Sequence, residues 1–166
     1  MDHIPHLFHF TDVRNLPSIS EHGGLYSAQR LQELGILGKV IRGGNEWSRS
    51  ADAWTDMDRY VHLCFTDDHP MEYLAKQDGR ILESRFLTVH AEVLHIEGTL
   101  FCDGVSNRAQ GVSYLPALEA GPSIDFEVLY EFTDWHDANI QARRKRARKY
   151  EILVPDFVPI KLITGF

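Results

Sequence analysis

The stretch HFTDVRNLPSISEHGGLYS, residues 9–27, determines how the chain begins to fold. The alternation of HLFHFT (6–11) predicts a short strand. Asn15 then suits the N-cap of a helix, because Pro17 follows in the first turn and the glycine pair at 23–24 ends the segment. We therefore expect a strand, a capped helix and a glycine turn in direct succession.

Outward from this stretch, the sequence predicts more strands and short helices without regular β-α-β spacing, which favours an α+β fold with antiparallel pairing. A length of 166 residues predicts one domain, residues 1–166. The predicted strands are 60–65, 86–96, 99–104, 150–155 and 160–166. The predicted helices are 27–37 and 67–77, and the second has an aspartate cap. Residues 126–132 fit either a strand or a helix, residues 106–120 are partly helical, and residues 38–58 are irregular.

The composition is that of a globular protein, with 43% apolar residues. No apolar run approaches the roughly 20 residues that would span a bilayer, and the N-terminal residues lack the pattern of a secretory signal. Two cysteines, Cys64 and Cys102, are too few for a disulfide scaffold and do not form a CxxC motif. We therefore expect reduced thiols, a cytoplasmic location and no membrane association.

Positive charge is concentrated in one short segment of an acidic chain. Six of the seven residues from Arg143 to Lys149 are basic, and without them the formal charge of −7 would become −13. Such a segment is either a solvated face or a stripe that contacts phosphates, and composition leaves both interpretations open.

Several kinds of site are not supported by the sequence. The nine histidines are scattered, with no HExxH motif and no cysteine pair, so no metal site is expected. The glycine pairs at 23–24 and 43–44 belong to neither a Walker A motif nor a GxGxxG motif. A GxSxG nucleophile elbow is also missing.

Three pieces in a fixed order remain: HFT (9–11) before the capped helix, YVHLCF (60–65) before a helix with Tyr73, and Glu151 at the head of a late strand. This order resembles the ADP-ribosyltransferase superfamily of the His-aromatic-Glu type, and within it the DarT-like DNA ADP-ribosyltransferase toxins. The residues 9–27 carry the most specific similarity. Supporting matches are FTDDHPMEYLA (65–75), LFCDGVSNRA (100–109) and RKRARKYEILVP (144–155).

The resemblance implies a split β-sandwich of two small, mainly antiparallel sheets with flanking short helices. It also implies NAD as co-substrate and Glu151 as the catalytic carboxylate. A carboxylate beside the ribose could offset the positive charge of the breaking nicotinamide–ribose bond and accept a proton from the acceptor base. Alternation supports this interpretation, since Glu151 would face away from a core that holds Ile152 and Val154.

The remaining site residues come from the same resemblance. Arg49 is the nearest match to the catalytic arginine, with Arg42 and Arg59 as alternatives. For NAD, His9 would contact a ribose, the Phe10 backbone and Thr11 the carboxamide, and Phe65 and Tyr73 would stack on nicotinamide. Asn15 and Ser18 lie where the family binds NAD, although both also suit simple helix or cap roles. Each aromatic equally fits a core position.

The acceptor implied by the resemblance is a base of single-stranded DNA, with the protein acting as the toxin of a toxin–antitoxin or phage-defence system. A macrodomain antitoxin of the DarG type would remove the mark. The sequence leaves open the base, an RNA or protein acceptor, and a non-catalytic binding module. The predicted DNA contacts are Arg143, Arg144, Lys145, Arg146, Arg148 and Lys149 for phosphates, with Trp47 and Trp54 for an unpaired base.

Overall fold

The computed structural model of the protein describes residues 3–107 and 111–166, and the side chains of residues 46–48 and 54 lie outside that description. Within the described residues, seven strands form one antiparallel sheet and two more form a small antiparallel sheet. Across the large sheet the order is β6 (Tyr114–Pro116), β5 (Leu100–Cys102), β7 (Glu151–Pro155), β3 (Tyr60–Cys64), β1 (His6–Asp12), β4 (Ser84–His90) and β9 (Ile163–Thr164). The small sheet pairs β2 (Gly24–Tyr26) with β8 (Phe157–Pro159).

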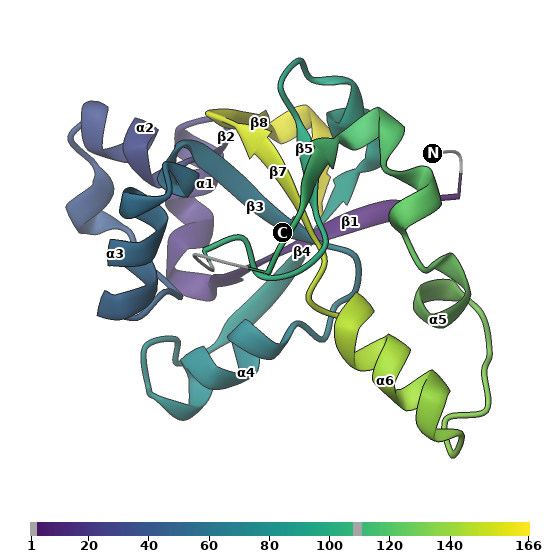
Figure 1. The fold of residues 1–166 in the computed structure, drawn as a ribbon. Helices are drawn as coiled ribbons and strands as arrows, with labels where there is room; N and C mark the ends of the chain where they lie inside the picture. The colour runs from purple at the N-terminus through teal and green to yellow at the C-terminus, as the bar shows by residue number, and fades with distance from the viewer. Residues whose placement is uncertain (1–2, 108–110) are drawn as a thin grey trace.

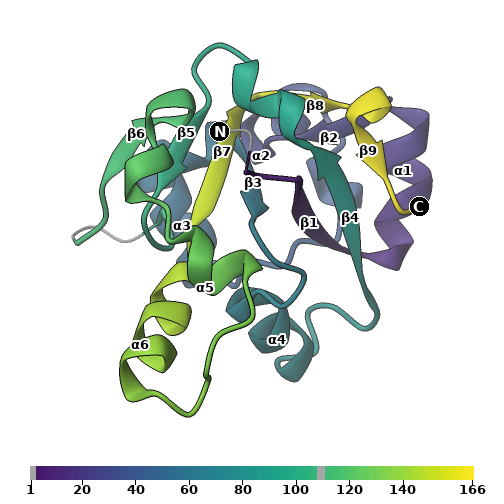
Figure 2. The same ribbon diagram turned by 90° about the vertical axis from the view of Figure 1, so that its right-hand side faces the viewer.

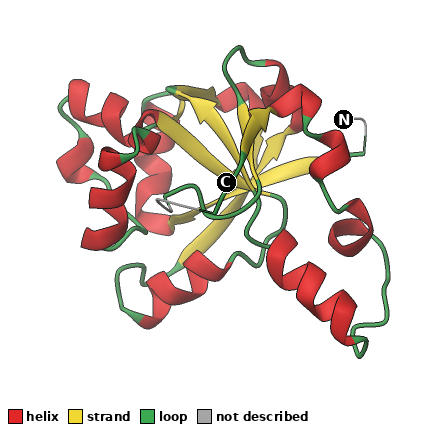
Figure 3. Cartoon of the chain, in the orientation of Figure 1, coloured by secondary structure: helices red, strands yellow, loops and turns green. Residues whose placement is uncertain are grey.

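The helices are short and lie around the sheet (Figures 1 and 3). They are α1 (Leu16–Glu21), α2 (Ala28–Glu33), α3 (Glu46–Trp54), α4 (Pro70–Gln77), α5 (Phe126–Tyr130) and α6 (Ala138–Ala147). In Figure 1, α2 and α3 lie on the opposite side of the sheet from α5 and α6. Figure 2 shows that α6 extends away from the strands, so most of this helix meets solvent.

Strand β7 lies in the middle of the large sheet and is buried on both faces. Ile152 and Val154 are fully buried in the hydrophobic core, where they pair with Leu63 and Val61 of β3. Since successive side chains point to opposite faces, Glu151 is on the other side. The structure therefore has the predicted orientation of β7, with Ile152 and Val154 facing the core and Glu151 facing away from it.

Helix α6 begins with a complete N-cap. The Asp137 side chain accepts hydrogen bonds from the backbone N–H groups of Asn139 and Ile140. The last turn is basic, which suits the negative end of the helix dipole. Ala147 lies within the hydrophobic core and Ile140 packs against it, so the cationic side chains of α6 lie on its outer faces.

The predicted α+β class with antiparallel pairing is confirmed, but the two sheets are unequal in size. Residues 38–58 are not wholly irregular, because α3 forms after the glycines at 43–44. The strand expected over 86–96 stops at His90, and a 3-10 helix (Ala91–His95) follows, which buries the adjacent residues Val93 and Leu94. A strand cannot bury two neighbours on one face.

Other local predictions are corrected by the structure. His69, not an aspartate, caps α4, since its Nδ1 accepts the Met71 N–H at 3.3 Å. The segment 126–132, whose sequence fits either a strand or a helix, contains helix α5. The described part of 106–120 is helical in part, as predicted, because strand β6 is followed by the 3-10 turn Ala117–Glu119. The last predicted strand begins with a 3-10 turn, Ile160–Leu162, and only Ile163–Thr164 pairs with β4.

In the part of the chain that the structure describes, none of the helices combines the length and the apolar character that crossing a membrane requires.

Candidate active site

A cleft opens where β1 meets α1 and the loop that follows α2. Two adjoining hollows, of about 420 and 890 Å³, share His9, Thr11 and Asn15 in their linings. His9 and Thr11 lie two residues apart on β1, so both side chains point to the same face. Strand β1 thereby forms the floor of the cleft.

Asn15 connects this floor to the cleft wall. Its Nδ2 donates to Thr11 Oγ1 at 3.0 Å and to the Ile41 carbonyl oxygen at 2.8 Å, while its Oδ1 accepts the Ile41 N–H at 2.9 Å. The predicted N-cap contact of the Asn15 side chain does not form. The amide instead fixes the loop that carries Arg42.

Two arginines line the larger hollow. Burial and the neighbouring Arg49 guanidinium both lower the pKa of Arg42. Arg49 Nη1 donates to the Gly44 carbonyl oxygen at 3.3 Å, and the described residues place no carboxylate within ion-pair distance of either guanidinium. Asp52 and Asp58 also line this hollow and partly offset the two positive charges, which still favour an anionic ligand nearby.

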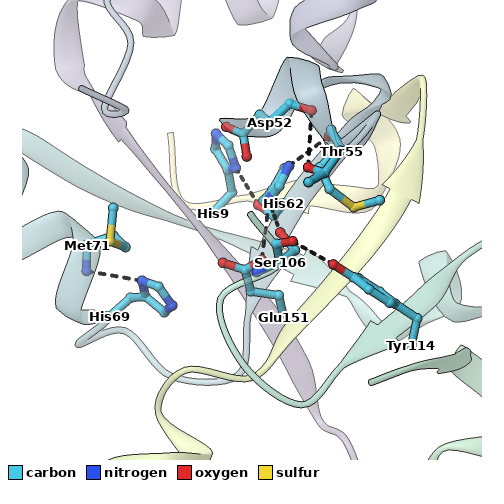
Figure 4. A network of polar contacts seen from close by, with 10 residues as sticks. His9, Asp52, Thr55, His62, His69, Met71, Ser106, Tyr114 and Glu151 are labelled. Carbon is cyan, nitrogen blue, oxygen red and sulfur yellow. Dashed lines mark hydrogen bonds and ion pairs between the residues drawn. The ribbon is translucent and has the colours of Figure 1, made fainter. Parts of the chain in front are cut away.

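Glu151 lies at the head of β7 with only 6% of its surface exposed. Its Oε2 accepts a hydrogen bond from the Ser106 N–H at 3.1 Å and lies 3.3 Å from His62 Nδ1. Figure 4 shows Glu151, His62 and Ser106 pointing toward one another. Both of these contacts are made by the same carboxylate oxygen, Oε2.

His62 is held between two acceptors. Its Nδ1 faces the Glu151 carboxylate, and its Nε2 lies 3.0 Å from the carbonyl oxygen of Met57. Neither acceptor can donate, so both contacts are hydrogen bonds only when both ring nitrogens carry protons. Burial opposes that charge, but the hydrogen bond and the negative charge of Glu151 raise the pKa of His62 to about 9.

The same ion pair acts on the carboxylate. Burial would raise the pKa of Glu151, and the contact with His62 outweighs it and lowers that pKa. The carboxylate is therefore ionised although it is almost fully enclosed. Tyr114 supports the arrangement, because its hydroxyl donates to the Ser106 carbonyl oxygen at 2.6 Å (Figure 4).

Neutral thiols flank the carboxylate. Cys64 of β3 and Cys102 of β5 are the register partners of Glu151 on its two sides. Burial raises the pKa of the Cys64 thiol and raises that of Cys102 to about 12. No second negative charge from these neighbours competes with the carboxylate.

The model of the DarT family, described as ssDNA thymidine ADP-ribosyltransferase, matches residues 8–166. The chain belongs to the DarT family. The resemblance inferred from the sequence is thus confirmed. Among curated protein sequences, none matches this chain significantly.

Solved structures with the DarT fold agree with this assignment. Thermosipho africanus DarTG in complex with ADP-ribose has a TM-score of 0.70 and 16% identity, covering 96% of this chain and 43% of that chain. Thermus sp. 2.9 DarT in complex with ADP-ribosylated ssDNA has a TM-score of 0.65 and 18% identity, and the match covers 96% of this chain and 79% of the Thermus chain. The same Thermus protein in complex with NAD⁺ has a TM-score of 0.64 and 20% identity, with equal coverage. The chain thus spans less than half of the Thermosipho chain.

The structure brings together most residues that the DarT resemblance singled out. His9, Phe10, Thr11, Asn15 and Arg49 line the larger hollow, while Ser18 lines the smaller one. Ser18 also lies within hydrogen-bond distance of His22 Nδ1, at 3.3 Å. Of the alternative arginines, Arg42 lines the cleft, whereas Arg59 forms an exposed ion pair with Asp56.

Two aromatic residues lie elsewhere. Phe65 is 2% exposed and packs edge-on against Phe101 and Tyr150 in the core. Tyr73 is 61% exposed on α4, where its hydroxyl accepts a hydrogen bond from Gln77. Neither ring lines the two hollows, so the structure gives no support to stacking on nicotinamide by these residues. The side chains of Trp47 and Trp54 lie outside the described residues.

The six cations predicted to contact DNA divide into two groups. Arg143 is paired with Asp125 and Glu127, Arg146 with Asp103, and Arg148 with Asp68. Within the described residues, Arg144, Lys145 and Lys149 form no ion pair. The segment is a helix followed by a short turn, so its positive charge is spread over more than one face.

His62, Ser106 and Asp52 were not among the predicted site residues. Asp52 lines the cleft, has a buried Oδ1 without a hydrogen-bond partner in the described residues, and has a pKa raised by burial. The alternation of YVHLCF did contain a signal for His62, which must face away from the core if Val61 and Leu63 face it. The contact of Ser106 with Glu151 joins residues 45 positions apart and has no local signal.

Proposed function

We propose that this protein transfers ADP-ribose from NAD to a thymidine base in single-stranded DNA and releases nicotinamide. The observation that carries the proposal is the ionised, nearly enclosed carboxylate of Glu151, held by His62 and Ser106 in a DarT-family chain. Thermus DarT structures in complex with NAD⁺ and with ADP-ribosylated ssDNA support the choice of both substrates.

The residues that line the cleft would bind NAD. Arg42 and Arg49 would neutralise the pyrophosphate, since a guanidinium pairs well with phosphate oxygens. His9 and Thr11 would hold a ribose and the carboxamide, the latter together with the Phe10 backbone. Asn15 would act by keeping the Arg42 loop in place, and Ser18 by lining the inner hollow.

Transfer breaks the bond between C1′ and the nicotinamide nitrogen, and the bonding electron pair neutralises the charge of the pyridinium. Glu151 would orient the ribose hydroxyl through Oε1 and offset the positive charge that develops on C1′. A nitrogen of the base then bonds to C1′, and its proton passes to the carboxylate. His62 would keep Oε2 fixed, so the carboxylate needs little reorganisation.

The acceptor strand would be attracted by the cations of α6 and the turn after it. An acidic protein with one basic segment binds DNA with a strong dependence on salt. A macrodomain antitoxin of the DarG type and a cytoplasmic location belong to the same proposal, as does one catalytic domain over residues 1–166. The similarity to the Thermosipho DarTG chain supports the partner.

The test incubates wild type, Glu151→Gln and Glu119→Gln with labelled NAD and three acceptors: single-stranded DNA, RNA and total protein. Glu119 is an exposed carboxylate on the 3-10 turn Ala117–Glu119, so its variant is the matched control. We expect label on DNA from wild type and Glu119→Gln, and at least a roughly 100-fold loss with Glu151→Gln at unchanged NAD affinity.

Label on RNA or protein that depends on Glu151 would retain the chemistry and contradict the acceptor. NAD binding without label or nicotinamide release under low salt would leave a binding module, which contradicts the proposal. Mass spectrometry of the digested DNA would identify the modified base.

A further inference from the structure

An exposed tryptophan stands at the start of α6, beside the basic residues of that helix. Trp135 is 60% exposed, and Gln141 Nε2 donates to its carbonyl oxygen at 2.8 Å. The His136 ring lies 4.6 Å from the indole, centroid to centroid. The backbone of this residue is therefore held in place, and more than half of its surface remains open to solvent although His136 lies against one side of the indole.

Trp135 and the cations line the same groove. Its lining includes Trp135, Gln141, Arg144, Lys145, Arg148 and Lys149. Arg148 is held by Asp68, which lies on the opposite wall with Pro70. The three other cations form no ion pair within the described residues, so the groove carries uncompensated positive charge.

The groove leads toward the proposed catalytic centre. Lys149, at one end, precedes Glu151 by two residues, and Trp135 lies before the first turn of α6. The 10 residues of α6 span about 15 Å, so the groove follows the helix over about that length between Trp135 and Lys149. Figures 1 and 2 show the helix running outward from the sheet along this path.

We propose that this groove binds the part of a DNA single strand that flanks the modified base, with one flanking base stacked on Trp135. The proposal rests on the proposed function and extends it by several nucleotides. Aromatic faces combined with cations that follow a phosphate backbone are the recurring features of single-strand binding. Inside a duplex both faces of a base are covered by the neighbouring base pairs, so the groove selects an unpaired strand.

The test is the affinity for a fluorescein-labelled 12-nucleotide DNA, measured by anisotropy without NAD. Phe132→Ala is the matched control, because Phe132 is fully exposed in the same loop but does not line the groove. We expect Trp135→Ala to weaken binding about 10-fold, and Trp135→Phe and Phe132→Ala to stay within about twofold. On a trinucleotide that reaches only the catalytic centre, Trp135→Ala should match wild type.

Equal binding by wild type and Trp135→Ala would overturn the proposal, as would an equal loss with Phe132→Ala. A roughly tenfold preference for RNA of the same length would overturn the assignment to DNA. Because binding is measured without NAD, the result is separate from transfer activity. Groove binding with no transfer would refute the proposed function alone, and transfer without a Trp135 effect would refute this inference alone.

Discussion

His62 is the residue whose hydrogen bonds define the state of the Glu151 carboxylate, the catalytic group of the proposed function. Its Nδ1 faces the Glu151 carboxylate and the Ser106 hydroxyl, and its Nε2 faces the Met57 carbonyl oxygen, so the contacts with Glu151 and Met57 are both hydrogen bonds when the ring is a cation. A neutral side chain of similar size would leave the carboxylate without a charge partner. His62 belongs to the segment YVHLCF, but its contact with Glu151 depends on the pairing of β3 with β7, which joins residues far apart in the sequence.

We predict that His62→Gln lowers kcat by about 10- to 100-fold, because it removes the cation that fixes Glu151, and that KM for NAD changes less, although His62 also lines the larger hollow. The folded-state pKa of His62 is raised to about 9, above its ordinary value of 6.5. Its stabilising contribution is therefore full below pH 6.5 and is lost as the pH rises through about 9.

Thermal unfolding of wild type and His62→Gln between pH 6 and 10 checks this. The difference in melting temperature should be constant at the acidic end and shrink through about pH 9. His95→Gln, in an exposed position, serves as the control. A difference that is independent of pH would show that the cationic form of His62 is not what stabilises the fold.

At the scale of elements, α6 shows how a run of like charge is accommodated. Arg143 and Arg146 face acidic residues on neighbouring elements, whereas Arg144, Lys145 and Lys149 have no ion-pair partner among the described residues. The two interpretations left open by composition, solvated face and phosphate-contacting stripe, therefore apply to different members of the same segment.

We predict that Lys145→Gln and Lys149→Gln each reduce the slope of log affinity against log salt for single-stranded DNA by about 0.7, the value for one phosphate contact. Arg143→Gln is the matched control, because its guanidinium is already occupied by Asp125 and Glu127. Titration of anisotropy at several salt concentrations gives the slopes. Equal slopes for all four proteins would contradict a role of these lysines in phosphate binding.

The elements that could be predicted from sequence are those with one buried face and a clear end. Strand β1 and helix α1 are of this kind, because alternation and the glycine turn both act locally. The sequence did not reveal α3 or the 3-10 turn after β4, where polar composition and continued alternation mimic other structures. Site contacts such as Asn15 with Ile41 were missed, because an amide that suits a cap locally is used by a loop 26 residues away.

Considered as a whole molecule, the large sheet places Glu151 in a row with two thiols. Cys64 and Cys102 are buried on either side of Glu151, and Cys64 Sγ donates to the Phe8 carbonyl oxygen. Their reactivity therefore reports on the integrity of the sheet around the site. Separation of these strands is the event that would expose them.

We predict that neither thiol of the native protein reacts with a disulfide reagent at pH 8 on the time scale of a free cysteine, since burial keeps both protonated. In denaturant, two thiols should react at a rate that follows global unfolding measured by circular dichroism. Rapid labelling without denaturant would indicate that the sheet opens locally near Glu151.

The central place of β7 also has a consequence for the order of biosynthesis. This strand fills the gap between β3 and β5, yet it is translated after both of them and after every residue of the NAD cleft. A ribosome-bound chain that ends before β7 carries the cleft residues but lacks the carboxylate. On the proposed mechanism, such a nascent chain cannot modify DNA, so translation must pass β7 before the cell is exposed to the activity.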